Sequence, residues 1–365
     1  MEDFVHRGAS PGVARRPNEK TRRKFSERTG MRTAFREAAS IGARLFKRII
    51  PMKTSSIFSL FFGMAFCASP VLAIERTPAA TGKIVVPPTS EWCAKIKELA
   101  PSKPRVKPKA HRKVLVFSLM TGYKHAVNPY VKKLMDILAS TGAFEVVQSV
   151  NIDDFAPENL KGFDAVVLNN TCSKGPRRNM FLDVLDKRKD MTDAQKTARA
   201  EELEKSLEDF VASGKGLVLV HGGIVFLNNS KEFKKMAGAS FIRHPRRQNI
   251  TLKLVEPDHP QVAAFKGEAF AHNDEPYLFS YADGGKELRP LLEMDLTSLD
   301  KTTQKNIGTE RRYVSWIKKY GKGRVFFVSP SHQPESYEST RLLQFYLDGI
   351  QYALGDFPCD DSPAK

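Results

Sequence analysis

Four short polar segments hold the residues of this chain that are best suited to chemistry. They combine histidine with glycine, carboxylate or tyrosine side chains, which can exchange protons, bind a metal ion or contact a polar ligand. Each segment stands at a place where a strand should end, and ligands of open α/β sheets bind beyond the carboxyl ends of strands. The segments are residues 121–125, 221–223, 272–277 and 328–337.

The most informative segment is the turn that follows Leu217–Val220. These four apolar residues predict a strand buried on both faces of a parallel sheet, and the chain then breaks into His221-Gly222-Gly223. We expect His221 to be an acid–base or polarising group. We expect Gly222 and Gly223 to expose backbone amides near a ligand oxygen. The alternative is a tight turn in which His221 packs against a neighbouring loop.

The first segment lies between a predicted strand and a predicted helix. A glycine turn before a helix N-terminus can receive an anionic or polar ligand. We therefore expect Gly122, Tyr123 and His125 to contact substrate. The alternative is structural, because any doubly wound fold needs such a turn, and a single His125 is more typical of a capping or surface residue.

The third segment places Asp274 and Glu275 beside His272 and Tyr277. Because adjacent residues of an extended stretch face opposite ways, we expect one of the two carboxylates to point into a site. We assign Glu275 a catalytic role, and we assign Asp274 and Tyr277 to substrate binding. An acidic surface loop is the alternative.

The fourth segment pairs His332 with Glu335, and we expect both to act in acid–base catalysis. The pair resembles the His-Pro-Glu triplet of class I glutamine amidotransferases, with the glutamate displaced by one residue. The turn at His221 likewise resembles the nucleophile elbow of those enzymes, but neither cysteine nor serine stands at its tip. Amide hydrolysis on that scaffold needs a thiolate at the elbow, so we predict no glutaminase activity.

Standard cofactor motifs are missing from the sequence. No Gly-x-Gly-x-x-Gly follows the first predicted strand, and no Walker-type loop, His-Glu-x-x-His or Cys-x-x-Cys occurs. A divalent metal held by dispersed residues stays open, with His125, His221, Glu275 and His332 as candidate ligands. Histidines hydrogen-bonded around a sugar explain the same residues. We therefore assign no metal-binding residue and leave the cofactor undetermined.

The elements that must position these segments alternate between strand and helix. This alternation predicts an α/β fold with a doubly wound parallel sheet. The second half differs, because loops rather than helices join its predicted strands before a closing helix. No internal repeat occurs, and we expect one compact domain. The predicted elements are 113–118, 127–140, 144–150, 164–169, 201–212 and 217–220, followed by 250–255, 288–294, 312–318, 324–329 and 340–354.

The net charge of +17 is distributed unevenly along the chain. Residues 1–73 carry fourteen Lys and Arg against five Asp and Glu, about half of the basic excess. We interpret residues 1–51 as a basic disordered extension, or as the result of a start codon placed too early, with Met52 the true start. Because so much of the excess precedes the folded pattern, we expect no nucleic-acid partner.

Residues 52–73 have the pattern of a secretory signal peptide. Met52-Lys53 opens the segment, an apolar run extends from Ile57 to Leu72, and small residues mark a cleavage site. We expect a secreted or periplasmic protein that matures at about Ile74 and has no stable membrane span after cleavage. An unusually long basic n-region and an uncleaved membrane anchor are the alternatives.

Export would place the cysteines where disulfides can persist. Cys93 and Cys359 flank the folded region, and we weigh a bridge between them against two free thiols because domain termini often lie close together. Cys172 is more typical of a small buried residue at a strand end than of a nucleophile. The remaining segments are a Pro/Lys-rich arm at 74–110, with a short helix at 91–99, and a C-terminal tail at 357–365.

In this order, the four polar segments resemble the trehalose-utilisation (ThuA-like) family. Asp258-His259-Pro260 and the run 321–326 add to the resemblance, which spans about residues 112–355; we place the domain at 111–356. It implies a flavodoxin-like, class I glutamine amidotransferase-like fold and a role in disaccharide or glycoside utilisation. The charged insertion at 174–197 departs from the family, and we expect a solvated flap over the site.

Two functions fit these residues. The first is an exported enzyme that acts on a carbohydrate, such as a disaccharide, a glycoside or an oxidised sugar, through its histidines and glutamates. The second is a non-catalytic sugar-binding module in which Tyr123, Tyr277 and Trp316 stack on the ligand. In both cases the partner is a small-molecule carbohydrate. The oligomeric state stays open.

Overall fold

The computed structural model describes residues 85–330 and 332–364 of the 365-residue chain. The predicted basic extension at 1–51 and the predicted signal peptide at 52–73 lie outside the described residues. Within the described part, no helix is both long enough and apolar enough to cross a bilayer.

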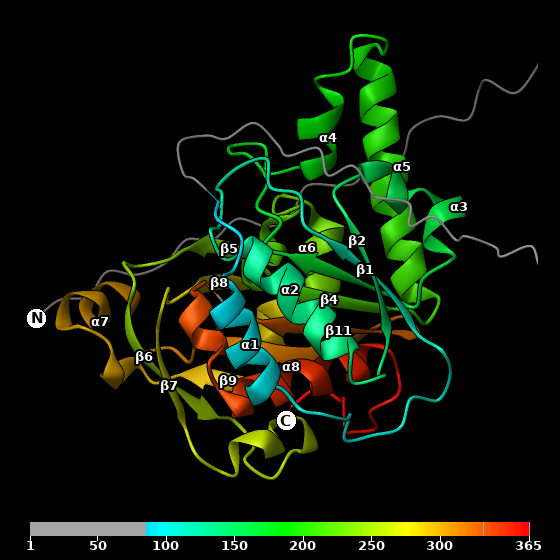
Figure 1. The fold of residues 1–365 in the computed structure, drawn as a ribbon. Helices are drawn as coiled ribbons and strands as arrows, with labels where there is room; N and C mark the ends of the chain where they lie inside the picture. The colour runs from blue at the N-terminus through cyan, green and yellow to red at the C-terminus, as the bar shows by residue number, and fades with distance from the viewer. Residues whose placement is uncertain (1–84, 331, 365) are drawn as a thin grey trace, which may run out of the picture. The chain divides into compact units, whose positions relative to one another are not determined.

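A nine-stranded sheet joins a parallel half to an antiparallel half (Figure 1). The parallel half has the order β2-β1-β3-β4-β11, which is the 2-1-3-4-5 order of flavodoxin-like folds. The predicted α/β fold class is therefore confirmed. The antiparallel half adds β10, β9, β6 and β7, and β5 pairs with β8 in a separate sheet. The strands are β1 Lys113–Phe117, β2 Glu145–Ser149, β3 Ala165–Asn169, β4 Gly216–Val220, β5 Ala239–Arg243, β6 Gln248–Leu254, β7 Phe270–Asp274, β8 Leu278–Tyr281, β9 Arg289–Met294, β10 Tyr313–Tyr320 and β11 Gly323–Val328.

The core lies around the parallel strands, which helices cover. Every residue of β3 and β4 is buried, as expected for strands with covered faces. In Figure 1, α1 and α2 lie in front of these strands, and α8 packs on β4 and β11. The helices are α1 Ser90–Leu99, α2 Asn128–Ala139, α3 Pro157–Leu160, α4 Met180–Leu185, α5 Asp193–Ala212, α6 Lys231–Ala237, α7 Lys301–Ile307 and α8 Thr340–Ala353.

The described part of the predicted arm packs on the domain. It contains α1, which corresponds to the short helix expected there, and Trp92 is buried edge-on to Tyr130 with ring centroids 4.9 Å apart. Farther along the arm, the Arg105 guanidinium binds the buried Asp348 carboxylate of α8 at 2.7 Å. These contacts make residues 85–110 part of the folded unit rather than a free linker.

The C-terminal segment also packs on the domain. Phe357 is buried, and the amide of Ala364 donates a hydrogen bond to the Leu288 carbonyl at 3.0 Å. Cys93 and Cys359 are both free and half-buried, so the disulfide weighed from the sequence is not formed. The two ends of the domain are fixed by packing and hydrogen bonds instead.

The charged insertion at 174–197 is helical and partly buried, which corrects the expectation of a solvated flap. Phe181 of α4 is fully buried and packs edge-on against Phe155 and Phe226. The Thr192 side chain and Gln195 form a reciprocal capping box that begins α5. The charged residues cover the outer faces of elements whose apolar faces join the core.

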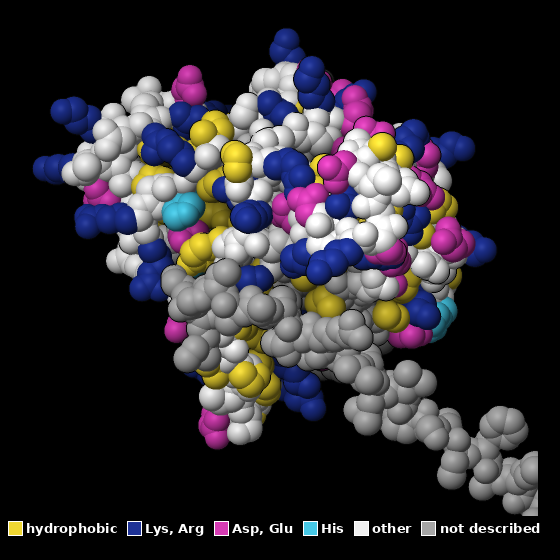
Figure 2. Space-filling view, turned by 90° about the horizontal axis from the view of Figure 1, so that it is seen from above, with side chains coloured by type: hydrophobic (Ala, Val, Ile, Leu, Met, Phe, Trp, Pro, Cys, Tyr) yellow, Lys and Arg dark blue, Asp and Glu magenta, His cyan; other side chains and the backbone are white. Residues whose placement is uncertain are grey.

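Charges of both signs share the described surface. Figure 2 shows a face on which Lys and Arg side chains are interspersed with Asp and Glu. Ion pairs account for part of this mixture, because Arg177 binds Asp186 at 2.5 Å and Arg188 binds Asp190 at 2.6 Å. The face in this view presents alternating charge rather than one continuous basic patch.

Candidate functional site

Three histidines from separate loops meet at the carboxyl edge of the parallel strands. His125 lies in the loop after β1, His221 directly follows β4, and His332 lies in the loop after β11. Their ring centroids are 5.1 to 5.3 Å apart. One ring nitrogen from each lies within 4.8 Å of the other two. We call these three residues the histidine cluster.

His221 occupies the tip of the turn after β4 in a strained backbone conformation. Its φ of 47° lies in the left-handed region, which a non-glycine residue rarely adopts, and its side chain is fully buried. Nδ1 lies 2.8 Å from the Ser329 carbonyl, which can only accept, so Nδ1 carries the proton. The other ring nitrogen, Nε2, lies 3.1 Å from His332 Nδ1.

Glu275 is the carboxylate that contacts the histidine cluster. Its Oε2 lies 3.1 Å from His332 Nδ1 and 3.5 Å from His221 Nε2. Burial alone would raise the pKa of Glu275, but hydrogen bonds from His221 and His332 hold that pKa below its usual range. The carboxylate stays ionised and can stabilise positive charge on either imidazole.

His125 supplies a neutral imidazole to the same site. Burial, with repulsion from the other two imidazoles, holds the pKa of His125 well below its ordinary value. The ring is almost completely enclosed, and its Nδ1 is buried without a hydrogen-bond partner. His125 is therefore part of the cluster and not the capping or surface residue that the sequence suggested as an alternative.

Asp274 positions the loop that carries His332. Its Oδ2 accepts a hydrogen bond from the His332 backbone amide at 3.2 Å and one from Ser336 Oγ at 3.4 Å. Asp274 is buried at the end of β7, whereas the next residue, Glu275, reaches the imidazole rings. Of these two carboxylates, one orders the backbone and the other contacts the side chains that could react.

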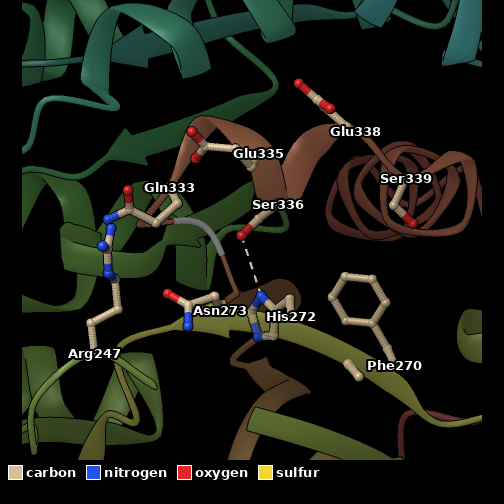
Figure 3. Close-up of a pocket in the computed structure, with 10 residues that line it drawn as sticks. Arg247, Phe270, His272, Asn273, Gln333, Glu335, Ser336, Glu338 and Ser339 are labelled. Atoms are coloured by element: carbon tan, nitrogen blue, oxygen red, sulfur yellow. Dashed lines mark hydrogen bonds between the residues drawn. The ribbon is translucent and has the colours of Figure 1, made fainter. Parts of the chain in front are cut away.

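A hollow of about 400 Å³ lies between the strand β7 and the loop that follows His332, and no residue of the histidine cluster lines it (Figure 3). Ligand pockets typically enclose about 300–1,000 Å³, so the hollow is large enough for a small molecule. His272 stands at its wall, and Figure 3 shows Ser336 Oγ directed at His272 Nδ1, 3.2 Å away. The lining residues are Arg247, Phe270, Ala271, His272, Asn273, Gln333, Glu335, Ser336, Glu338 and Ser339.

Comparisons with known proteins identify the family. The ThuA family model, described as trehalose utilisation, matches residues 113–353. The chain belongs to the ThuA family. Membership gives this protein a carbohydrate-related role.

Solved ThuA-like structures resemble the chain at low identity. A putative ThuA-like protein from Bacteroides uniformis is 15% identical with a TM-score of 0.49, over 68% of this chain and 94% of its own. One from Parabacteroides merdae is 16% identical with a TM-score of 0.48, over 70% and 95% of the two chains. No relative was found among curated proteins.

The three aromatic residues considered for sugar stacking in this ThuA domain differ in their exposure to solvent. Tyr123 is 44% exposed, and its ring centroid lies 4.8 Å from that of His125. Tyr277 is buried and packs against the His221 ring with a centroid distance of 4.0 Å. Trp316 is fully buried and donates to the Ala237 carbonyl, so it is a core residue and not the stacking surface expected for a sugar.

The predicted substrate-binding glycines lie where backbones and rings approach closely. A Cβ on Gly222 would lie 2.6 Å from His125 Cε1, and one on Gly223 would lie 2.1 Å from the Leu168 carbonyl oxygen. A Cβ on Gly122 would meet the Ser173 carbonyl oxygen at 2.4 Å. At these three positions only glycine fits without a shift of its neighbours.

Cys172 lies next to the loop that follows β1. Its backbone carbonyl accepts hydrogen bonds from the amides of Thr121 and Gly122 in that loop. Burial raises the pKa of the Cys172 thiol, although Arg178 lies 3.7 Å from the sulfur. A buried neutral thiol matches the expected small filler at a strand end.

The structure does not place Glu335 where the sequence pairing with His332 suggested. Glu335 is exposed and lines the hollow, whereas Glu275 makes the contacts to the imidazoles. Sequence reasoning also missed His244, whose Nε2 lies 3.6 Å from Glu275 Oε2 and whose ring stacks on Tyr277. No spacing pattern identified His244, which stands in a basic stretch between β5 and β6.

Proposed function

We propose that this protein is an exported enzyme of carbohydrate utilisation that uses histidine–glutamate acid–base chemistry and lacks glutaminase activity. Its substrate class is a disaccharide, a glycoside or an oxidised sugar. The observation that carries the proposal is the buried histidine cluster with Glu275 against it; the loop that carries His332 continues into the wall of a hollow of about 400 Å³. Titratable groups with shifted pKa values beside a pocket are typical of active sites.

The hollow has the chemistry that a sugar requires. Its amide, hydroxyl and charged side chains can exchange hydrogen bonds with sugar hydroxyls, and Phe270 offers an apolar surface. His272 and Ser336 connect this wall to Asp274, which holds the His332 backbone. A sugar in the hollow would therefore be held by the same loop that carries a reactive imidazole.

The cluster contains the groups that proton transfer requires. His221 Nδ1 faces the Ser329 carbonyl, its Nε2 lies 3.1 Å from His332 Nδ1, and His332 Nδ1 lies 3.1 Å from Glu275 Oε2. A proton taken up by His332 would be stabilised by the ionised Glu275 at 3.1 Å. We assign His221 and His332 the acid–base roles and Glu275 the role of orienting and stabilising them.

The decisive experiment measures turnover by the full-length protein. A panel of native and oxidised disaccharides and glycosides is incubated with the wild type and with His332→Ala, and products are followed by mass spectrometry. We expect product from at least one sugar with the wild type, and none with His332→Ala. The matched control is His111→Ala, because His111 is an exposed histidine outside the cluster. Normal turnover by a folded His332→Ala protein would exclude His332 from the mechanism.

The second candidate is a non-catalytic sugar-binding module on the same scaffold. Two observations favour it: His221 stands where related scaffolds carry a nucleophile, and the exposed Tyr123 beside the cluster offers a stacking surface. Calorimetric binding of a sugar, with no product after prolonged incubation, would support the module and contradict the enzyme.

The proposed location is the periplasm or the exterior, by way of residues 52–73 as a signal peptide. Mass spectrometry of the protein recovered from a secreting host should give a mature chain that begins near Ile74. An intact chain retained in the cytoplasm would contradict export. We propose a small-molecule carbohydrate as the partner and no nucleic acid.

A further inference from the structure

We propose that the histidine cluster, with Glu275, binds one divalent transition-metal ion of the zinc class. The inference concerns the same site as the proposed function, but it depends on the donor geometry and not on any substrate. With the ion bound, His221 and His332 would serve as its ligands, and their acid–base role would pass to a group that the ion polarises.

The donor atoms already have the spacing that a small ion requires. Around a tetrahedral zinc ion with ligand bonds of about 2.0–2.1 Å, neighbouring donors are about 3.4 Å apart. In the structure, His221 Nε2 and His332 Nδ1 are 3.1 Å apart, and Glu275 Oε2 lies 3.1 and 3.5 Å from these two nitrogens. The third imidazole offers its nitrogen within 4.8 Å of both. Small side-chain shifts are enough to complete the site.

The burial of His125 is a second, independent observation. Its side chain is 2% exposed, and Nδ1 is buried without a hydrogen-bond partner. A buried polar atom left unpaired costs about 1–3 kcal/mol, so native proteins rarely retain one without a reason. A metal ion bound through this nitrogen gives it the partner that it otherwise lacks.

The surroundings orient the ligands as metal sites usually do. Histidines that bind metals commonly donate their other ring proton to a carbonyl or carboxylate, which fixes the tautomer. His221 does this by donating from Nδ1 to the Ser329 carbonyl at 2.8 Å, which leaves Nε2 free to coordinate. The His332 backbone is fixed in turn by Asp274. The left-handed φ of His221 holds that imidazole at the tip of the turn.

The donor set selects the kind of metal. Imidazole nitrogens suit zinc, iron, cobalt, nickel and copper, whereas calcium and magnesium prefer all-oxygen sites. Three imidazoles and one carboxylate leave a dipositive ion with a net charge of +1. With four protein ligands, the ion would have to expand to five coordinates to take up a carbonyl oxygen or a water, which it would then polarise as a Lewis acid. The polarised group would be the carbonyl of an oxidised sugar or a water that attacks a glycoside.

Metal stoichiometry tests the inference directly. The full-length protein is stripped with a chelator, dialysed against Zn²⁺ or Co²⁺, and analysed for bound metal by plasma mass spectrometry. We expect about one ion per chain, visible absorption bands of tetrahedral Co²⁺, and a raised melting temperature. His332→Gln and Glu275→Gln should lower the affinity at least tenfold, and His111→Ala should bind as the wild type does.

Two variants guard against misfolding as an explanation. His125→Ala removes a buried ring, so we expect it to lower stability. His332→Gln alters a partly exposed loop residue and should leave the fold intact. Circular dichroism checks the fold of both variants. A wild type that binds less than a tenth of an equivalent, or folded variants that retain the full stoichiometry, would overturn the inference. Stoichiometric metal without turnover of any sugar would refute the proposed function alone. Turnover by a folded protein that binds neither Zn²⁺ nor Co²⁺ would refute the metal site alone.

Discussion

At the scale of single residues, the reactive potential of this protein depends on which carboxylate reaches the imidazoles. Two glutamates were candidates, and the structure brings Glu275 within 3.1 Å of His332 while Glu335 lines the neighbouring hollow. Hydrogen bonds to His221 and His332 keep Glu275 ionised despite its burial. Glu275 therefore supplies the negative charge beside the imidazoles. Glu335 can contact only a ligand bound in the hollow.

Glu275→Gln should separate these two roles. The amide has nearly the same shape but cannot stabilise an imidazolium, so we expect kcat/KM to fall by about 10²- to 10⁴-fold with the fold intact. Glu335→Gln should act mainly through KM and by less, because it changes a wall of the hollow and not the cluster. Steady-state kinetics on the best sugar give both values. Equal losses in kcat for the two variants would contradict this division.

The absence of glutaminase activity is also decided by single residues. His221 occupies the tip where a nucleophile would stand, and burial keeps the Cys172 thiol neutral. We expect no ammonia release from glutamine in a coupled assay, and no labelling of the turn by glutamine-analogue alkylators. Ammonia production that disappears in Cys172→Ser would show that this prediction is wrong.

At the scale of elements, the turns after β1 and β4 hold one another in place. The backbone of Gly222 approaches the His125 ring so closely that no side chain fits between them. The turn after β4 therefore positions its own histidine and also the histidine of the loop after β1. The site depends on this contact between two separate loops.

Gly222→Ala should move the His125 ring while His125 itself stays unsubstituted. The new Cβ would lie 2.6 Å from Cε1, so the ring must shift or the turn must distort. We expect metal stoichiometry and turnover to fall together, with a moderately lower melting temperature. Gly162→Ala is the control, because its nearest neighbour is the Asn159 carbonyl oxygen at 3.5 Å. Unchanged metal binding in Gly222→Ala would mean that His125 is not a ligand.

At the opposite edge of the sheet, Asp164 connects three strands. It precedes β3, accepts from the Lys113 amide at 3.0 Å, and binds Lys215 Nζ at 2.9 Å. Burial would raise the pKa of Asp164, but the hydrogen bonds from Lys215 and the Lys113 amide lower it overall. A carboxyl whose folded pKa is depressed stabilises the fold above its unfolded pKa of about 3.9 and loses that contribution as pH falls below this value.

Asp164→Asn should therefore destabilise the protein in a pH-dependent way. At pH 7 we expect the free energy of unfolding to drop by about 1–2 kcal/mol, since charged hydrogen bonds are lost. The difference from the wild type should shrink as the pH falls below about 4. Urea denaturation at pH 7 and pH 3 measures both values. A difference that does not change with pH would mean that the ionised carboxylate is not responsible.

At the scale of the whole molecule, the segment before β1 is part of the fold. Trp92 of α1 packs on Tyr130 of α2, and Arg105 reaches the buried Asp348 of α8. The final residues pack on the domain as well, through Phe357 and Ala364. The domain thus extends beyond the residues that the family match covers.

Trp92→Ala measures the contribution of this segment. Removing a large buried aromatic side chain typically costs about 3–5 kcal/mol, so we expect a clear loss of thermal stability, with the sheet intact at low temperature. Val86→Ala is the matched control, because Val86 is 54% exposed in the same segment. Equal melting temperatures for the wild type and Trp92→Ala would show that the segment adds no stability.

The sequence by itself determined the parallel half of the sheet and the positions of its polar turns. Short apolar runs such as Leu217–Val220, followed by glycine, specify buried strands and the edge at which their loops meet. The sequence also showed directly that no cysteine stands at the tip of the turn after β4. These features are local, because a strand of this kind and its turn are encoded within about ten consecutive residues.

Only the tertiary structure decided which side chains meet. Glu275 and Glu335 are equally good acids in the sequence, but the backbone at the end of β7 directs one of them to His332. His125 resembles a surface residue until the turn after β4 encloses it. The pairing of β6 with β9 and the core position of Trp316 depend on contacts between distant segments, which no local pattern of residues encodes. The free state of Cys93 and Cys359 was likewise visible only in the folded structure.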